Sequence, residues 1–213
     1  MYLSKLTFSN HLIGARRLIA SPYQLHKAVM RAFLDADNGG PGRVLFRVDH
    51  SDNSDPAYLL VQSEKKPDWQ KAEQLLGCMA LPPESKHLDL KFNKGQVLYF
   101  RLQANPTIKR KMGDNKASKR LGLLREEDQL TWLKRKAEEG GFSILSCVTT
   151  TKEMLGETKI DNETKHKLSL LSIRFEGVLK VEDSGAFLET VRSGIGSAKG
   201  LGFGLLSLAP IRG

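Results

Sequence analysis

Cysteine is scarce in this chain: only Cys78 and Cys147 occur among its 213 residues. Neither forms a CxxC pair or a cluster with histidine, so we expect neither a disulfide framework nor a structural zinc site. Free cysteines are typical of a reducing compartment, where they behave as small apolar residues. The sequence therefore favours a cytoplasmic protein.

Long apolar runs and several catalytic motifs are also absent. No run of about 18 apolar residues occurs, which argues against a membrane-spanning helix. The opening residues, MYLSKLTFSN, alternate as a strand does and lack the apolar core of a signal peptide. The motifs HExxH, GxSxG and the P-loop are missing, so we expect no metal and no nucleotide cofactor.

Positive charge is what the sequence has in excess. Its 33 Lys and Arg residues outnumber 24 Asp and Glu residues, which gives a formal net charge of +9. A basic chain of this size suggests a polyanionic partner, most often a nucleic acid. An anionic membrane surface is less favoured as a partner, because no long basic amphipathic helix occurs.

Two similar series of secondary-structure patterns follow one another along the chain. The first half has strand patterns at 2–8, 43–50, 57–64 and 87–92 and helical patterns at 21–35 and 67–79. The second half has strand patterns at 96–106, 142–150, 168–181 and 204–210 and helical patterns at 125–141 and 184–194. Both halves have the order β-α-β-β-α-β of a ferredoxin-like or RRM-like unit. We therefore predict an α+β fold of two tandem ferredoxin-like (RRM-related) domains, residues 1–94 and 95–213.

The segment SPYQLHKAV begins the first predicted helix and contains the first candidate site. Ser21 suits an N-cap, Pro22 suits the first helical position, and Gln24 completes a capping box with Ser21. The predicted core stripe consists of Leu25, Ala28, Val29 and Ala32. These signals predict a helix with a well-defined start.

Tyr23 and His26 lie on a flank beside this stripe, three residues apart, while Lys27 and Arg31 face elsewhere. The partial positive charge at a helix N-terminus favours a phosphate there and tends to lower the pKa of a nearby histidine. The two side chains can therefore address one phosphate group. The alternative is a histidine that borders the core and binds water.

Residues 105–120, NPTIKRKMGDNKASKR, form a basic segment without apolar periodicity, which we interpret as a mobile loop. One acid, Asp114, stands against six cations: Lys109, Arg110, Lys111, Lys116, Lys119 and Arg120. Such a loop can neutralise RNA phosphates with salt-dependent affinity. The alternative is a solvated charged loop without a ligand.

Residues 193–210, SGIGSAKGLGFGLLSLAP, are rich in glycine and contain one lysine, Lys199, followed by Gly200. Glycines allow a backbone to approach a ligand closely and expose N–H groups to phosphate oxygens. The spacing matches neither a P-loop nor a GxGxxG turn, so a nucleotide triphosphatase is disfavoured. The segment suits an RNA backbone, although glycine-rich turns also occur in plain β-structure. Because the RNP1 pattern is missing, the sheet face is not expected to be the usual RNA platform.

Four segments occur in a characteristic order: SPYQLHKAV, VLYFRLQANP, FEGVL and GIGSAKGLGFGLLSLAP. Together they resemble the CRISPR RNA-processing endoribonucleases of the CasE (Cse3) type, of subtype I-E, over essentially the whole chain. The resemblance implies two tandem ferredoxin-like domains. It also implies metal-independent cleavage of precursor CRISPR RNA at the base of the repeat stem-loop, which leaves a 5′-hydroxyl and a 2′,3′-cyclic phosphate.

The same resemblance implies partners and site residues. The partners are the CRISPR repeat stem-loop, to which the enzyme stays bound after cleavage, and the other subunits of the Cascade complex. The family's active-site tyrosine and histidine match Tyr23 and His26. Its basic hairpin for the RNA major groove falls at about 150–168, where the candidate cations are Lys152, Lys159, Lys165 and Lys167. Which of these lysines contacts a base is left open.

RNA carries its own nucleophile, the 2′-hydroxyl, so cleavage needs a base, an acid and a balance for the charge of the phosphorane. We expect His26 to transfer a proton near neutral pH and Tyr23 to orient the phosphate or share the proton work. Lys27 and Lys199 are candidates to balance the charge. The assignment of acid and base stays open.

Two other functions fit parts of the sequence. A non-catalytic module that holds an RNA hairpin would explain the basic and glycine-rich segments equally well, and only Tyr23 and His26 separate it from the enzyme. A small-molecule enzyme of ferredoxin-like fold is disfavoured by the net charge and by the lack of cofactor motifs.

Overall fold

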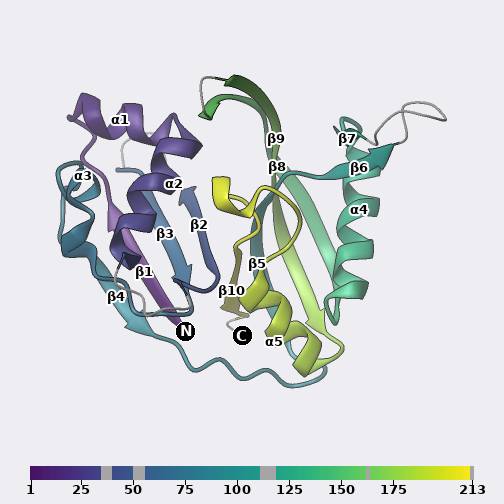
Figure 1. Cartoon of the computed structure of the whole chain (residues 1–213). Coiled ribbons are helices and arrows are strands. Elements are labelled where there is room, and N and C mark those ends of the chain that lie inside the picture. Colours follow the sequence, from purple (N-terminus) through teal and green to yellow (C-terminus); the bar gives the residue numbers. More distant parts are fainter. Residues whose placement is uncertain (35–39, 50–55, 111–118, 162–163, 212–213) are drawn as a thin grey trace. The chain divides into compact units, whose positions relative to one another are not determined.

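A computed structural model (Figure 1) describes residues 1–34, 40–49, 56–110, 119–161 and 164–211. The chain divides into two compact units. The first consists of Met1–Leu90 and Lys199–Leu205, and the second of Lys91–Ala198 and Leu206–Gly213. None of the helices in these described ranges is long and apolar enough to cross a membrane.

The first unit is built on a four-stranded antiparallel sheet with the order β2-β3-β1-β4. Its strands are β1 (Tyr2–Thr7), β2 (Val44–Asp49), β3 (Tyr58–Ser63) and β4 (Glu84–His87). Its helices are α1 (Ile13–Ile19), α2 (Pro22–Met30), α3 (Glu73–Leu76) and the short 3-10 turns η1 (Arg31–Phe33), η2 (Trp69–Lys71) and η3 (Lys199–Leu201). The first strand lies between the third and the fourth, which is the ferredoxin-like arrangement.

Period-two and helical patterns explain the core of this unit. Successive residues of β2 face opposite sides of the sheet, and Phe46 points into the core, where it is 1% exposed. The same core contains Leu6 of β1, Val61 of β3 and the stripe of α2 that includes Leu25 and Val29. Burial of these apolar side chains fixes α2 against β2.

The second unit repeats this topology. Its sheet has the order β10-β5-β9-β8, made of β5 (Val97–Ala104), β8 (Phe142–Asp161), β9 (Thr164–Val181) and β10 (Leu206–Pro210). Its helices are α4 (Glu126–Glu139) and α5 (Ser184–Ser193), and β6 (Thr107–Arg110) pairs with β7 (Lys119–Gly122) in a separate ribbon. The first strand again lies between the third and the fourth, so the predicted tandem ferredoxin-like fold is confirmed.

Aromatic side chains fill the core of the second unit. Trp132 of α4 stacks on Phe175 of β9 with ring centroids 6.3 Å apart. Phe187 of α5 contacts Phe142 at 5.4 Å and Phe92 at 4.7 Å between ring centroids. Aromatic pairs of this kind add to the free energy gained from burial, and they hold both helices on one face of the sheet.

Two local predictions about the first unit were wrong, and one helix was missed. The helix expected at 67–79 is divided into η2 and α3, because Ala72 has φ −96° and ψ 54°. The strand expected at 87–92 is Glu84–His87 instead, since residues 84–87 pair with β1. Helix α1 was not expected. All four β4 side chains are exposed, so this strand has no apolar alternation from which to predict it.

Two differences concern the basic and glycine-rich segments. Part of the segment predicted as a loop, 105–120, forms the β6–β7 ribbon. Residues 199–205, assigned by sequence to the second domain, belong to the first unit. Strands β8 and β9 also extend well beyond the predicted 142–150 and 168–181, pairing as far as Asp161 and Thr164.

Candidate active site

Helix α2 begins as its sequence predicts. The hydroxyl of Ser21 accepts a hydrogen bond from the backbone N–H of Gln24 at 3.3 Å, and Pro22 occupies the first turn. Leu25, Ala28 and Val29 are buried, which confirms the predicted core stripe. The cap and the stripe together determine which flank of α2 carries the candidate catalytic residues.

His26 lies half-buried between this helix and strand β2. Its imidazole is roughly parallel to the ring of Phe46, with centroids 6.4 Å apart and an interplanar angle of 21°. Burial lowers the pKa of His26 below its usual value of 6.5. The neutral imidazole is therefore the favoured form near neutral pH, and a neutral imidazole can accept a proton.

Gly200, in the turn η3, lies beside the same imidazole. A Cβ atom placed on Gly200 would be 3.6 Å from Cε1 and 3.7 Å from Nδ1 of His26. Gly202 has φ +89°, and a Cβ atom there would be 3.3 Å from Cε2 of Phe46. The positive φ and the tight approach to Phe46 favour glycine at 202, while at Gly200 a Cβ atom would make only ordinary contact. The backbone of 199–205 runs along α2 and β2, as the yellow segment of Figure 1 does.

Tyr23 and Lys27 form a second contact on α2. The ammonium of Lys27 lies over the tyrosine ring, 4.6 Å from its centroid, which is an attractive cation–π arrangement. The expectation that Lys27 faces away from this flank was therefore wrong, because residues four apart are neighbours on a helix. Arg31 follows one turn later at the start of η1 and is exposed.

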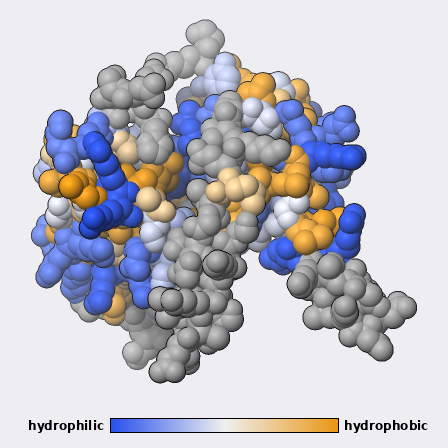
Figure 2. All heavy atoms as spheres, turned by 90° about the horizontal axis from the view of Figure 1, so that it is seen from above, coloured by the Kyte–Doolittle hydropathy of each residue, from blue (hydrophilic) through white to orange (hydrophobic). Residues whose placement is uncertain are grey.

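The surroundings of α2 are rich in cations. Residues 1–34 contain no Asp or Glu, but they contain Lys5, Arg16, Arg17, Lys27 and Arg31. The four cations of 11–34 are exposed, and Lys199 of η3 is partly exposed. Figure 2 shows mainly hydrophilic side chains over this unit, at the left of the view. An anionic ligand would meet a favourable potential here.

The sequence did not point to Arg47 and Asp49, which form a buried ion pair on β2. They are 2% and 1% exposed, and the Nη2 to Oδ2 distance is 2.7 Å. Nη1 of Arg47 also donates a hydrogen bond to the carbonyl oxygen of Leu205 at 3.2 Å. The available signal was RVD, two opposite charges two residues apart in an otherwise apolar strand.

The β6–β7 ribbon carries part of the predicted basic segment. Lys109 pairs with Arg120 and Arg110 with Lys119, and the side chains of Lys109, Arg110 and Arg120 are exposed. The base of the ribbon is fixed, because Leu123 N–H donates to Pro106 O at 3.0 Å. Lys111 and Lys116 lie outside the described residues, as does the side chain of Lys119.

The hairpin expected near 150–168 is present as the extension of β8 and β9. Its register pairs Thr158 with Lys167, Lys159 with His166 and Ile160 with Lys165, while Lys152 pairs with Ile173. These pairings describe the backbone. The side chains of Lys152, Lys159, Lys165 and Lys167 lie outside the described residues, so their proposed contacts with RNA stay predictions.

Neither cysteine is part of the candidate site. Cys78 and Cys147 are both free thiols, and burial raises the pKa of Cys147 to about 11. Within the described part of the chain, no group of three or more His, Cys, Asp or Glu residues is arranged to hold a metal ion. On the candidate helix, the structure instead brings Lys27 to Tyr23 and the backbone at Gly200 to His26.

Comparisons with known proteins cover nearly the whole chain. The family model described as "CRISPR associated protein" matches residues 1–210. The CRISPR-associated endoribonuclease Cse3 of Thermus thermophilus is 36% identical over 218 aligned positions, which cover 99% of this chain and 100% of that protein. The CRISPR system Cascade subunit CasE of Escherichia coli K12 is 32% identical with the same coverage. A solved structure of Cse3 bound to a 19-nucleotide RNA has a TM-score of 0.83, at 33% identity, over 99% of this chain and 100% of that one.

Proposed function

The chain belongs to the CRISPR associated protein family. On that premise we propose that it is the endoribonuclease that cleaves precursor CRISPR RNA, with Tyr23 and His26 as its catalytic residues. The resemblance inferred from four sequence segments is thereby confirmed at the level of the family. One observation carries the choice of site: His26 lies half-buried on a capped helix, with the glycine-rich backbone at Gly200 against its imidazole.

The proposed substrate is the repeat stem-loop of the precursor RNA, cut at the base of the stem. The products are a 5′-hydroxyl and a 2′,3′-cyclic phosphate, and the enzyme stays on the mature guide RNA as a Cascade subunit. The related proteins named Cse3 and CasE support the reaction and the assembly respectively. We propose a cytoplasmic location, which suits a chain whose two cysteines are free thiols.

The proposed chemistry uses the RNA's own 2′-hydroxyl. His26 in its neutral form accepts the 2′ proton as the oxygen attacks the adjacent phosphorus, and the bond to the 5′-oxygen breaks. Burial supports this assignment as the base, because it lowers the pKa of His26. Positioned proton transfer is typically worth about 10²- to 10⁴-fold in rate.

Tyr23 and the nearby lysines have supporting roles in this proposal. The phenol of Tyr23 donates a hydrogen bond to a phosphate oxygen, and the Lys27 ammonium over its ring makes the local potential more positive. Lys27 and Lys199 offset the charge that builds on the phosphorane. Water or Tyr23 protonates the departing 5′-oxygen. This route needs no metal, so cleavage should continue in EDTA.

The phosphates away from the cut meet the remaining cations. We propose that the β6–β7 ribbon, with Lys109, Arg110 and Arg120, contacts the RNA backbone, together with the lysines of the β8–β9 hairpin. Arg31, exposed one turn after Lys27, extends this surface along α2. Contacts of this kind supply affinity that falls as salt rises.

Replacing His26 by alanine tests the proposal most directly. His26→Ala should lower the single-turnover cleavage rate of a repeat hairpin by at least about 100-fold, since it removes a positioned proton-transfer group. The dissociation constant for the hairpin should change little. The measurement is a gel assay that resolves the cyclic-phosphate product, paired with a binding titration.

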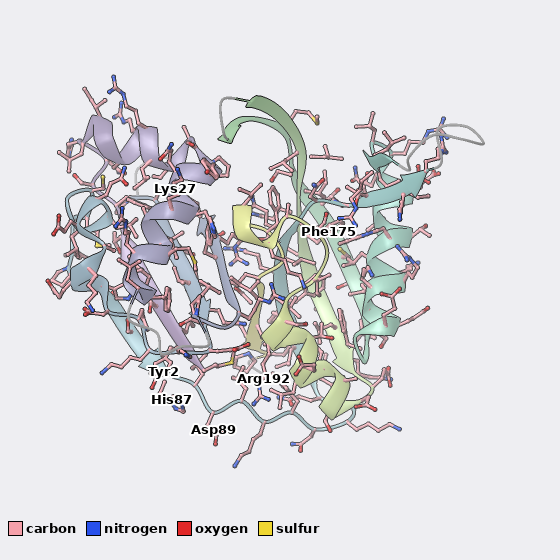
Figure 3. All side chains as sticks on the ribbon, in the orientation of Figure 1. Tyr2, Lys27, His87, Asp89, Phe175 and Arg192 are labelled. Carbon is pink, nitrogen blue, oxygen red and sulfur yellow. The ribbon has the colours of Figure 1, made fainter. Side chains whose placement is uncertain are left out.

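A matched control comes from a second tyrosine–histidine pair in the same unit. Tyr2 and His87 have ring centroids 5.2 Å apart, and Figure 3 shows them at the opposite end of the unit from Lys27. His87→Ala should cleave at the wild-type rate.

Cleavage by His26→Ala at the wild-type rate would contradict the proposal. Binding without cleavage by the wild-type chain would favour the non-catalytic hairpin-binding module. Cutting of a substrate with hydrogen in place of the 2′-hydroxyl would exclude internal attack.

A further inference from the structure

Arg47 and Asp49 present a charged pair where apolar packing would be expected. Nε of Arg47 donates to both carboxylate oxygens of Asp49, at 2.9 and 3.0 Å, and Nη2 donates to Oδ2 at 2.7 Å. Both residues come from β2 and lie on one face of it, since alternate residues of a strand share a face. The planar guanidinium is thus held in one orientation by the hydrogen bonds that it donates to this carboxylate.

In this orientation the Arg47 guanidinium also donates a hydrogen bond to the C-terminal segment. Nη1 of Arg47 donates to the carbonyl oxygen of Leu205, a residue 158 positions away. Leu205 ends the stretch Lys199–Leu205 that belongs to the first unit, and Leu206 begins β10. Arg47 therefore holds this stretch at its last residue, on a strand that lies at the edge of its sheet.

The neighbouring residue of β2 holds the middle of the same stretch. Phe46 faces the other side of the strand, where a Cβ atom on Gly202 would be 3.3 Å from its ring. That ring also stacks on His26. Along the stretch, Gly200 lies against His26, Gly202 against Phe46 and Leu205 against Arg47. The stretch passes from one face of β2 to the other around this edge strand.

Stability alone is a weak reason for such a pair. Two buried charges lose their hydration, and replacing a buried ion pair by apolar residues of similar size often leaves stability unchanged or improves it. An apolar pair, however, has no donor for the Leu205 carbonyl. What the ion pair adds is a directional contact that determines where the stretch lies.

We propose that Arg47 is a positioning residue for RNA cleavage: held by Asp49, it fixes Lys199–Leu205 so that Gly200 lies against His26. The inference rests on the proposed function of His26. The elements packed around His26 carry the titratable or charged groups Tyr23 and Lys27 of α2 and Lys199 of η3, and β2 faces it with the uncharged Phe46. Arg47 itself lies on the far face of β2 from Phe46 and acts through the backbone.

A charge-neutral double variant tests this role without leaving a buried charge unpaired. In Arg47→Met/Asp49→Leu, the melting temperature and the dissociation constant for the repeat hairpin should stay close to those of the wild type. The single-turnover cleavage rate should fall about 10- to 100-fold, as expected when a catalytic group is displaced by about 1 Å. The control is Arg101→Met/Glu176→Leu, which removes a partly exposed ion pair between β5 and β9 of the second unit.

A second measurement follows His26 without any RNA. In the double variant, displacement of Gly200 should expose His26 to more water, so the pKa of His26 should rise toward 6.5. The pKa is read from the imidazole NMR signal, which is assigned with His26→Ala. Arg47→Lys serves if the double variant does not fold. Lysine retains the buried charge beside Asp49, but it lacks the planar guanidinium that bonds Asp49 and Leu205 at the same time. The variant should therefore show a smaller fall in cleavage rate and a smaller rise in the His26 pKa.

The two readouts separate the possible failures. An unchanged cleavage rate would overturn the positioning role, whether or not the histidine signal moves. A slower rate with an unchanged histidine titration would also overturn it, because the loss would then arise elsewhere. If the wild-type chain does not cleave RNA, the proposed function fails, and the titration still decides whether Arg47 controls the surroundings of His26.

Discussion

His26 combines a helix position, a neighbouring ring and a backbone contact in one half-buried side chain. Phe46 and Gly200 take part of its surface from water, and that burial lowers its pKa below 6.5. The folded chain therefore binds this proton less tightly than the unfolded chain does. The contribution of His26 to folding stability is present above pH 6.5 and is lost as pH falls through the lower, folded pKa.

The same shift predicts a direction for the pH dependence of cleavage. If neutral His26 is the base, the rate at subsaturating enzyme should rise with pH through an inflection below 6.5 and then level off, since such rates report groups of the free enzyme. The measurement is the single-turnover cleavage rate at a series of pH values from about 4.5 to about 8. A rate that falls with rising pH across this inflection would assign His26 as the acid instead.

At the scale of elements, the β6–β7 ribbon carries cations proposed to bind RNA, whereas α2 carries the proposed catalytic residues. Paired positions of an antiparallel ribbon lie on one face, so Lys109 and Arg120 point to the same side. The base of the ribbon is held by the bond from Leu123 to Pro106 and by Gln129 of α4, whose Nε2 donates to Leu123 O at 2.7 Å. The ribbon thus presents cations from a fixed base, as expected of a phosphate-binding arm.

Removing two of these cations should change the salt dependence of binding. In Lys109→Ala/Arg120→Ala, the slope of log affinity against log salt should become shallower by about 1.4 to 1.8, because each lost phosphate contact accounts for about 0.7 to 0.9. The cleavage rate at saturating enzyme should not change. Filter binding over a series of salt concentrations measures the slope. The control, Lys134→Ala/Arg135→Ala on the exposed side of α4, should keep the wild-type slope; an equal change there would indicate a general charge effect.

At the scale of the whole molecule, the C-terminal segment contributes to both units. Lys199–Leu205 belongs to the first unit, and β10, which begins at Leu206, pairs with β5 in the second sheet. Phe203, Leu205 and Leu206 are each 3% exposed or less. Burial of each such side chain is worth about 1.5–3 kcal/mol, so the segment supplies an amount similar to the net stability of a typical domain.

Truncation after Ala198 should therefore weaken both units at once. We expect a lower melting temperature and faster amide exchange in β5, which loses its β10 partner, and in α2 and β2, which lose Lys199–Leu205. Hydrogen exchange followed by mass spectrometry resolves the elements separately. A chain that ends at Pro210 keeps β10 and is the control. Wild-type exchange in α2 and β2 after the longer truncation would refute a structural role for the glycine-rich stretch in the first unit.

Local patterns in the sequence were enough to predict much of this protein. Serine and proline at 21 and 22 defined the start of α2, and its apolar stripe defined the flank that carries Tyr23 and His26. Alternation located β1, β2, β3 and β5 closely, and the order of elements predicted the tandem ferredoxin-like fold. Each of these signals lies within a few residues of the feature it predicts, because caps and periodicities act locally.

Contacts between distant segments were decided only by the tertiary structure. The exposed strand Glu84–His87 exists because β1 pairs with it, and no apolar pattern marks it. Gly200 lies beside His26, and Arg47 bonds Leu205 across 158 positions. Glycine spacing and a charged pair in a strand do not encode their partners, since a long-range partner is selected by the packing of the whole unit. The sequence by itself thus determined the fold and the candidate catalytic pair, and the tertiary structure decided what surrounds His26.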